Sequence, residues 1–158
     1  MKFPERLVTD EEIQKAEEFL KRGYRHRLKV KGSEEFKRKV KEAIKFIRDA
    51  GFYEYLTTYI KEIMEIDGFT QLREAEAKIW ANKYAVQNPV DAASLFIQKA
   101  HHMKEYLEGK LYYGGDAERR SVEKRIEFLK ALKNKSRSEK VIEECERLLR
   151  SWDESVYL

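Results

Sequence analysis

The chain has 158 residues, enough for one domain that buries about two-thirds of the surface of its unfolded form. Hydrophobic residues make up 42% of it and charged residues 39%, with a formal net charge of +4. This composition supplies a hydrophobic core and excludes an intrinsically disordered chain. The sequence therefore predicts one folded domain over residues 1–158 with a strongly charged exterior.

Four Gln and three Asn stand against 62 charged residues, a bias typical of proteins from hot environments, and we expect a thermophilic source. A single cysteine, Cys145, excludes a disulfide within the chain and favours a cytosolic setting. The first residues lack the apolar stretch of a signal peptide, and no charge-free run approaches the roughly 20 residues of a membrane span. We expect a soluble, cytoplasmic protein that does not contact membranes.

The first predicted helix begins at Asp10, because Thr9 and Glu12 have the spacing of a capping box, and it ends or bends at Gly23. Residues 24–31 then alternate between apolar and basic side chains. This period of two predicts a short strand whose basic face is formed by Arg25, Arg27, Lys29 and Lys31. No partner strand is recognisable, so the segment would pair across a dimer, lie along a ligand or serve as a linker.

A second helix is predicted over residues 34–50, with Ser33 as N-cap and Gly51 at the C′ position. One side of this helix is apolar. On another side, four cations lie within about 80° of one another at 100° per residue: Arg38, Lys41, Lys45 and Arg48.

Both basic segments belong to a block of positive charge between Lys21 and Arg48. These 28 residues hold twelve Lys or Arg and three Asp or Glu, so the remainder of the chain sums to about −5. Clustered like charges repel unless a partner neutralises them, and the block therefore indicates a polyanion such as RNA or DNA. The predicted nucleic-acid-binding residues are Arg25, Arg27, Lys29, Lys31, Arg38, Lys41, Lys45 and Arg48. The alternative is a solvated face of a charged thermophilic protein.

Helical periodicity continues over residues 53–66, 70–87, 88–112, 117–133 and 138–152. Asn88-Pro89 is a helix-start signal, and Gly114-Gly115 is the clearest break in the chain. The sparsely charged stretch 78–100 should form the buried centre, with Phe96, Ile97 and Ala100 inside. The sequence thus predicts an all-α fold, a single-domain irregular or orthogonal bundle of six to seven helices.

No motif with catalytic chemistry stands out. His101 and His102 point about 100° apart on a helix, so they cannot both bind one metal in the i, i+4 manner. Cys145 falls on the apolar face of its helix, where it should be a small buried hydrophobe. The chain also lacks a Gly-rich phosphate loop. We therefore expect no catalytic residue, no metal and no cofactor, with an enzyme of unrecognised site left as an alternative.

The segment 52–59 is dense in aromatic residues: Phe52, Tyr53, Tyr55 and Tyr59. Such rings pack in a core with their hydroxyl groups at its boundary, or they form a surface that docks a protein partner. A scaffold domain that binds protein partners through this segment is the main alternative to nucleic-acid binding. A helix-turn-helix over residues 53–87 is a further alternative.

The stretch from Val40 to Phe52 resembles the small helical subunit of type III CRISPR effector complexes, which has a basic helix, an Ile-Arg element and a turn into an apolar helix. Residues 126–130 are similar to that family's terminal Trp-Leu-Lys helix. The likeness covers about a fifth of the chain and departs from the family pattern at Phe52 and Phe128. It implies that Lys41, Lys45 and Arg48 contact a nucleic-acid backbone without catalysis. Together with the charge block, it favours a non-enzymatic nucleic-acid-binding or assembly subunit.

Overall fold

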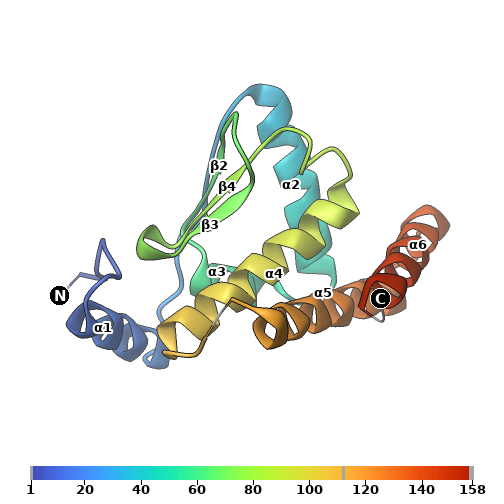
Figure 1. The fold of residues 1–158 in the computed structure, drawn as a ribbon. Coiled ribbons are helices and arrows are strands. Elements are labelled where there is room, and N and C mark those ends of the chain that lie inside the picture. Colours follow the sequence, from blue (N-terminus) through green and yellow to red (C-terminus); the bar gives the residue numbers. More distant parts are fainter. Residues whose placement is uncertain (1, 112, 157–158) are drawn as a thin grey trace.

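The structure is a computed structural model that describes residues 2–111 and 113–156 (Figure 1). The elements follow one another as α1 (Asp10–Lys21), β1 (Lys29–Lys31), α2 (Glu34–Asp49), α3 (Tyr53–Tyr59), β2 (Glu62–Glu65), β3 (Gln71–Arg73), a 3₁₀ turn (Glu74–Glu76), β4 (Lys78–Ala81), α4 (Pro89–Leu107), α5 (Gly115–Lys135) and α6 (Glu139–Val156). The prediction of a helix-rich chain is confirmed. The all-α class is wrong, because four strands form a sheet.

The sheet is mixed, with strand order β1-β2-β4-β3. Strands β1, β2 and β4 run parallel, and β3 is antiparallel to β4 at one edge. One row of apolar side chains crosses all four strands: Val30, Ile63, Ile79 and Leu72. All four side chains are buried or half-buried, so this face of the sheet packs against the core.

Two of the predicted helices are therefore corrected. The segment 53–66 is helical only as far as Tyr59 and then becomes β2, and residues 71–81 form β3, the 3₁₀ turn and β4 in place of a helix. The helix-turn-helix alternative is excluded with them. The helix prediction fails here because Glu, Ala, Lys and Leu favour helices. The alternation of apolar and polar residues in β4 covers only four residues, which is too short to indicate a strand.

The strand predicted within residues 24–31 exists only over Lys29–Lys31, and the expectation that the chain lacks a partner for it is wrong. β1 pairs in parallel with β2, with Val30 opposite Ile63. Parallel strands require a crossover connection between them, and here α2 and α3 supply it. The partner strand is thus far away in sequence, where a search for a nearby hairpin does not find it.

Helices α2 and α4 lie on one side of the sheet, and Figure 1 shows α5 and α6 continuing away from α4 toward the C-terminus. The predicted centre is confirmed, since Phe96, Ile97 and Ala100 on α4 have no exposed surface. Cys145 is also fully buried, as expected, and burial raises the pKa of its thiol to about 11. Among the residues that the structure describes, no helix has the length and apolar character needed to span a membrane.

The predicted helix starts are confirmed by their hydrogen bonds. Thr9 and Glu12 form a complete capping box at α1, and the Ser33 hydroxyl accepts the Phe36 N–H at α2. The Asn88 side chain accepts two backbone N–H groups at the start of α4, directly before Pro89. Gly51 follows α2 with a φ of 82°, a conformation that favours glycine.

A core substitution tests the placement of α4. Phe96→Ala should lower the free energy of unfolding by about 3–5 kcal/mol, because it removes a fully buried ring and leaves a cavity. The matched control is Phe69→Ala, since that ring is 90% exposed and its loss should change stability by less than about 0.5 kcal/mol. Urea unfolding of the three proteins measures both values. Equal effects of the two changes would contradict the packing described here.

An aromatic cluster fixes the N-terminal segment against the rest of the fold. The Phe3 ring stacks on Tyr24 at a centroid distance of 4.9 Å and meets the His26 ring edge-on at 4.7 Å. His26 is 6% exposed, and burial, with a smaller contribution from the charge of Lys61, lowers its pKa from 6.5 to about 4. The folded protein therefore holds His26 neutral.

This lowered pKa predicts a pH dependence of stability. Between pH 6.5 and pH 4 the unfolded chain binds a proton at His26 that the folded chain does not bind, so stability falls as the pH drops through this window. The free energy of unfolding should fall by roughly 3 kcal/mol over this pH range. His26→Phe removes the titrating group from an aromatic cluster that accepts a ring. Denaturant unfolding at pH 7.5 and 4.5 should show a smaller loss for the variant, and an equal loss would contradict the assignment.

A candidate nucleic-acid interface

A groove of about 720 Å³ lies between β1 and the outer flank of α2. Its lining divides into two chemical classes. We call the half-buried apolar residues the apolar wall, and they are Leu28, Val30, Ile44 and Tyr53. We call the cations the cationic wall, and they are Lys37, Arg38, Lys41, Lys45 and Arg48. Glu42 is the one carboxylate in the lining.

Local periodicity explains how the chain builds both walls. Leu28 and Val30 are two residues apart in an extended segment, so their side chains lie on the same side of it. On α2 the buried side consists of Phe36, Val40, Ala43 and Ile47. The cations occupy the adjacent flank of the same helix, and Ile44 lies between them and the core. The groove exists because β1 runs along this flank.

The cations of the groove differ in their partners. Lys37 and Arg38 pair with Glu34 and Glu35, which are exposed residues in the first turn of the same helix. Such exposed pairs contribute little and are readily exchanged for another anion. Lys41 and Lys45 have no carboxylate within 4.0 Å among the described residues, and their charge is free to meet a ligand.

Arg48 lies against an aromatic ring. Its guanidinium carbon is 3.7 Å from the centroid of the Tyr53 ring, in a cation–π contact. Arg48 is exposed and Tyr53 half-buried, so the pair presents a planar cation at the surface of the groove.

The predicted nucleic-acid-binding residues do not all meet at one place. The structure brings together the four from α2, which are Arg38, Lys41, Lys45 and Arg48, and places them in the groove. Lys29 and Lys31 alternate with the inward-facing Val30, so they lie on the opposite face of the sheet. The single basic face expected from residues 24–31 is therefore only two residues long.

The other two predicted residues lie outside β1. Arg25 forms an ion pair with Glu54 at 2.8 Å and borders a separate shallow hollow. Arg27 is exposed. Tyr24, which lies beside Arg25, packs on Phe3.

Sequence reasoning missed the apolar wall and Lys37. The alternation in residues 24–31 predicts Leu28 and Val30 on one side, and helical periodicity puts Ile44 near the apolar side of its helix, but these signals belong to different elements. Only the packing of β1 beside α2 brings them together. In the sequence, Tyr53 belongs to the aromatic segment, and nothing local links it to the cations of the groove.

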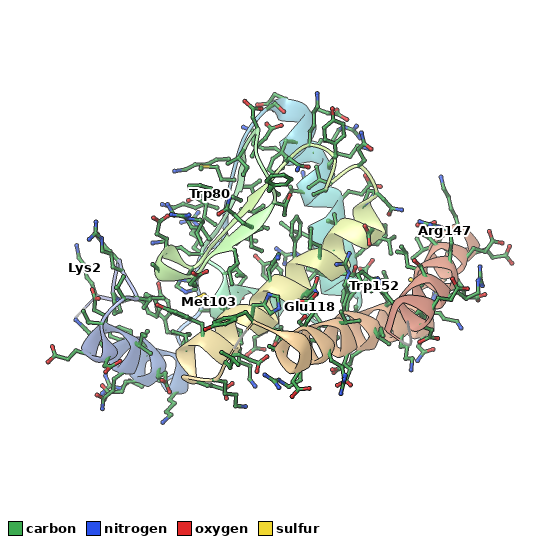
Figure 2. All side chains as sticks on the ribbon, viewed as in Figure 1. Lys2, Trp80, Met103, Glu118, Arg147 and Trp152 are labelled. Atoms are coloured by element: carbon green, nitrogen blue, oxygen red, sulfur yellow. The ribbon has the colours of Figure 1, made fainter. Side chains whose placement is uncertain are left out.

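On the open face of the sheet, Glu62 is 3% exposed and lies between two lysines. Its carboxylate oxygens are 2.9 Å from Lys31 Nζ and 3.0 Å from Lys78 Nζ. Burial alone would raise the pKa of Glu62, but hydrogen bonds from the two lysines outweigh it and hold the pKa below its usual value. Figure 2 shows Trp80 beside the sheet on the side away from α2, where the Arg73 guanidinium lies 4.4 Å from its ring. Lys31 is therefore occupied by an internal partner.

The aromatic segment packs within the fold. The Phe52 ring meets Phe128 of α5 at 5.5 Å, and Tyr55 meets Tyr59 at 5.3 Å. The ammonium group of Lys124 lies 4.6 Å from the Tyr55 ring. These contacts fit core packing of residues 52–59, and the protein-docking surface proposed for them stays a prediction.

A polar cluster joins α3, α4 and α5 around Glu105, which is 1% exposed. Arg120 Nη2 and His101 Nε2 lie 2.8 Å and 3.0 Å from its carboxylate oxygens, and the other nitrogen of His101 is 3.3 Å from the Tyr55 hydroxyl. Burial raises and the Arg120 hydrogen bond lowers the pKa of Glu105, with a net lowering, while burial lowers the pKa of His101. His101 is thus a neutral bridge between a carboxylate and a buried phenol whose own pKa is raised. His101 Nε2 and Glu105 Oε1 are buried and close to each other, but neither has a hydrogen bond of good geometry.

A second polar cluster centres on Arg125 of α5, which is 6% exposed. Its guanidinium donates to Ser94 Oγ and Gln98 Oε1, both at 2.8 Å, and to Asp91 Oδ1 at 2.7 Å. Ser94 and Gln98 are four residues apart on α4, which is also the spacing of two histidines that bind one zinc ion from the same helix. In this protein neither residue is a histidine, and the Arg125 guanidinium lies between the two side chains. Among the described residues, no group of three or more His, Cys, Asp or Glu side chains could hold a metal ion.

This second cluster should stabilise the fold. Arg125→Met should lower the free energy of unfolding by roughly 3 kcal/mol, because it leaves Ser94 and Gln98 buried without their donor. Lys130→Met on the same helix is the matched control, since Lys130 is exposed. Chemical unfolding compares them, and a small, equal effect of both changes would show that Arg125 does not fix α4 to α5.

Comparison with known proteins identifies no relative: no protein-family model, no curated protein and no solved structure matches this chain. The resemblance of residues 40–52 to the small CRISPR effector subunit therefore stays a hypothesis. In the structure this stretch forms the second half of α2 and the turn into α3.

Proposed function

We propose that the protein is a non-enzymatic nucleic-acid-binding or assembly subunit that contacts a phosphate backbone through the cationic wall of the groove. The observation that carries the proposal is the set of unpaired cations, Lys41 and Lys45, beside the stacked Arg48. Lys and Arg neutralise phosphates and release the counterions condensed on a nucleic acid, without any need to read its sequence.

The gathering of unpaired cations in one groove supports a ligand over a merely solvated face. The chain carries 29 acidic residues, and many cations elsewhere pair with them at short range, as Arg147 does with Glu144 and Lys124 with Glu127. Lys41, Lys45 and Arg48 have no ion pair among the described residues, and they lie together in one groove whose described lining holds a single carboxylate, Glu42. Unpaired cations also occur elsewhere, as at Lys130, so the support comes from the gathering of three in one groove.

The spacing supports an extended polyanion. Lys37, Lys41 and Lys45 follow one another at intervals of four residues, which places them along one line of the helix at steps of about 6 Å. A row of charges at regular steps suits a chain of repeated phosphates better than one small anion.

The non-enzymatic part of the proposal rests on the two polar clusters. Both clusters contain groups that could transfer protons. Glu105 and Arg125, however, are buried and form ion pairs with Arg120 and Asp91. The groove itself offers cations and apolar side chains, which bind but do not provide a nucleophile and its base. The proposal includes a cytoplasmic location and a thermophilic source, both supported by composition alone.

Docking of a protein segment is the second candidate function. The observation that favours it is the free edge of β1, which, within the part of the chain that the structure describes, has a neighbouring strand only on the β2 side. An extended segment of a partner can add to such an edge by backbone hydrogen bonds. A segment with acidic side chains would meet the same cationic wall.

A charge reversal tests the proposed function. The triple variant Lys41→Glu, Lys45→Glu, Arg48→Glu should lose at least tenfold in affinity for a labelled oligonucleotide in fluorescence anisotropy, because it replaces three attractions with three repulsions. The wild-type affinity should fall with salt by a log–log slope of about −0.7 to −0.9 per phosphate contacted.

The matched control carries the same change of charge on α5, α6 and their connection: Lys130→Glu, Arg137→Glu, Arg150→Glu. These three cations are exposed and have no ion-pair partner among the described residues. The control should retain binding, and circular dichroism should show that both triple variants are folded. Absence of wild-type binding at low salt, or equal losses in the two variants, would overturn the proposal.

A further inference from the structure

We propose that the ligand of the groove is single-stranded nucleic acid, and that one or more of its unstacked bases bind the apolar wall. This inference rests on the proposed function, and it adds what the cationic wall alone does not decide, namely the form of the nucleic acid.

The first step is the mixed chemistry of the groove. A duplex presents phosphates and sugars to a protein surface and keeps the faces of its bases stacked inside, so a cationic strip suffices to hold it. A single strand also exposes base faces, which bind to aromatic, guanidinium and apolar surfaces. Half-buried Leu28, Val30 and Ile44 lie in the same groove as the cations. Of the two forms of nucleic acid, the single strand is the one that exposes base faces to these apolar side chains.

The second step is the Arg48–Tyr53 pair. The guanidinium is 3.7 Å from the ring centroid, so one face of Arg48 is covered by the ring. A base can stack on the other face of the guanidinium plane, as bases of single strands do on Arg. The pair lies at the junction of the two walls, where a base and its own phosphate would both find a partner.

The third step is the edge of β1. The Lys29 N–H donates to the Lys61 carbonyl on the β2 side. Because successive residues of a strand point their backbone groups to alternate sides, the N–H and C=O of Val30 point to the free edge. These groups are available to the hydrogen-bonding edge of a base whose face lies on the apolar wall.

The size of the groove fits this assignment. About 720 Å³ is within the range of roughly 300–1,000 Å³ typical of sites that enclose small ligands. It admits individual bases while the backbone follows the row of lysines on α2.

The experiment separates the apolar wall from the cationic wall. Fluorescence anisotropy measures binding of a mixed-sequence 12-nucleotide single strand, as DNA and as RNA, and of the blunt duplex of the same sequence. The double variant Val30→Thr, Ile44→Gln makes the apolar wall polar without changing charge. The control, Val8→Thr with Leu111→Gln, makes matched changes at two side chains that are 62% and 60% exposed elsewhere.

We expect the wild-type protein to bind the single strand at least tenfold more tightly than the duplex. Val30→Thr, Ile44→Gln should lose about tenfold for the single strand, with duplex binding and the salt slope unchanged, and the control should behave as wild type. Thermal melts establish that each variant is folded.

Equal affinity for duplex and single strand, or an unaffected double variant, would overturn this inference and leave the proposed function standing. Failure of every oligonucleotide to bind would overturn the proposed function as well. Binding of a peptide of alternating Glu and Leu, in the absence of oligonucleotide binding, would do the same and assign the groove to a protein partner.

Discussion

The parallel pairing of β1 with β2 is the constraint on which the rest of this structure depends. It fixes Val30 opposite Ile63 and so commits one face of the sheet to the core. Because the connection between parallel strands must cross over the sheet, the pairing also forces α2 onto that face, beside β1. The groove is a direct consequence, since its lining comes from β1 and the residue before it and from the crossover helices α2 and α3.

The charges of the protein are arranged by the same packing. On α2 the apolar side is buried, which leaves the cations of the neighbouring flank at the surface and next to the strand. On the open face of the sheet, Lys31 and Lys78 approach Glu62 from both neighbouring strands and form ion pairs with it. Lys31 and Lys78 are thus neutralised within the fold, whereas Lys41 and Lys45 in the middle of α2 have no ion pair among the described residues.

The buried polar clusters around Glu105 and Arg125 differ in role from the charges at the surface. Glu105 and Arg125 are nearly inaccessible, and burying a charge is costly unless partners of opposite charge and hydrogen bonds compensate for it. Each is compensated by neighbours from adjoining helices, so these clusters specify how α3, α4 and α5 meet. His101 and Glu105, one helical turn apart on α4, are residue types that suggest catalysis in a sequence, and here they contact Tyr55 of α3 and Arg120 of α5.

The sequence by itself determined the helix boundaries with side-chain caps, the burial of the centre of α4, and the gathering of four cations on one flank of α2. Each of these depends on residues within a few positions of one another, because caps and helical faces are local. Only the tertiary structure decided that residues 62–65, 71–73 and 78–81 are strands, and that Leu28 and Val30 lie beside the cations of α2. Strand pairing joins segments far apart in the chain, and its free energy comes from burying Ile63 and Ile79 against helices, which no local propensity records.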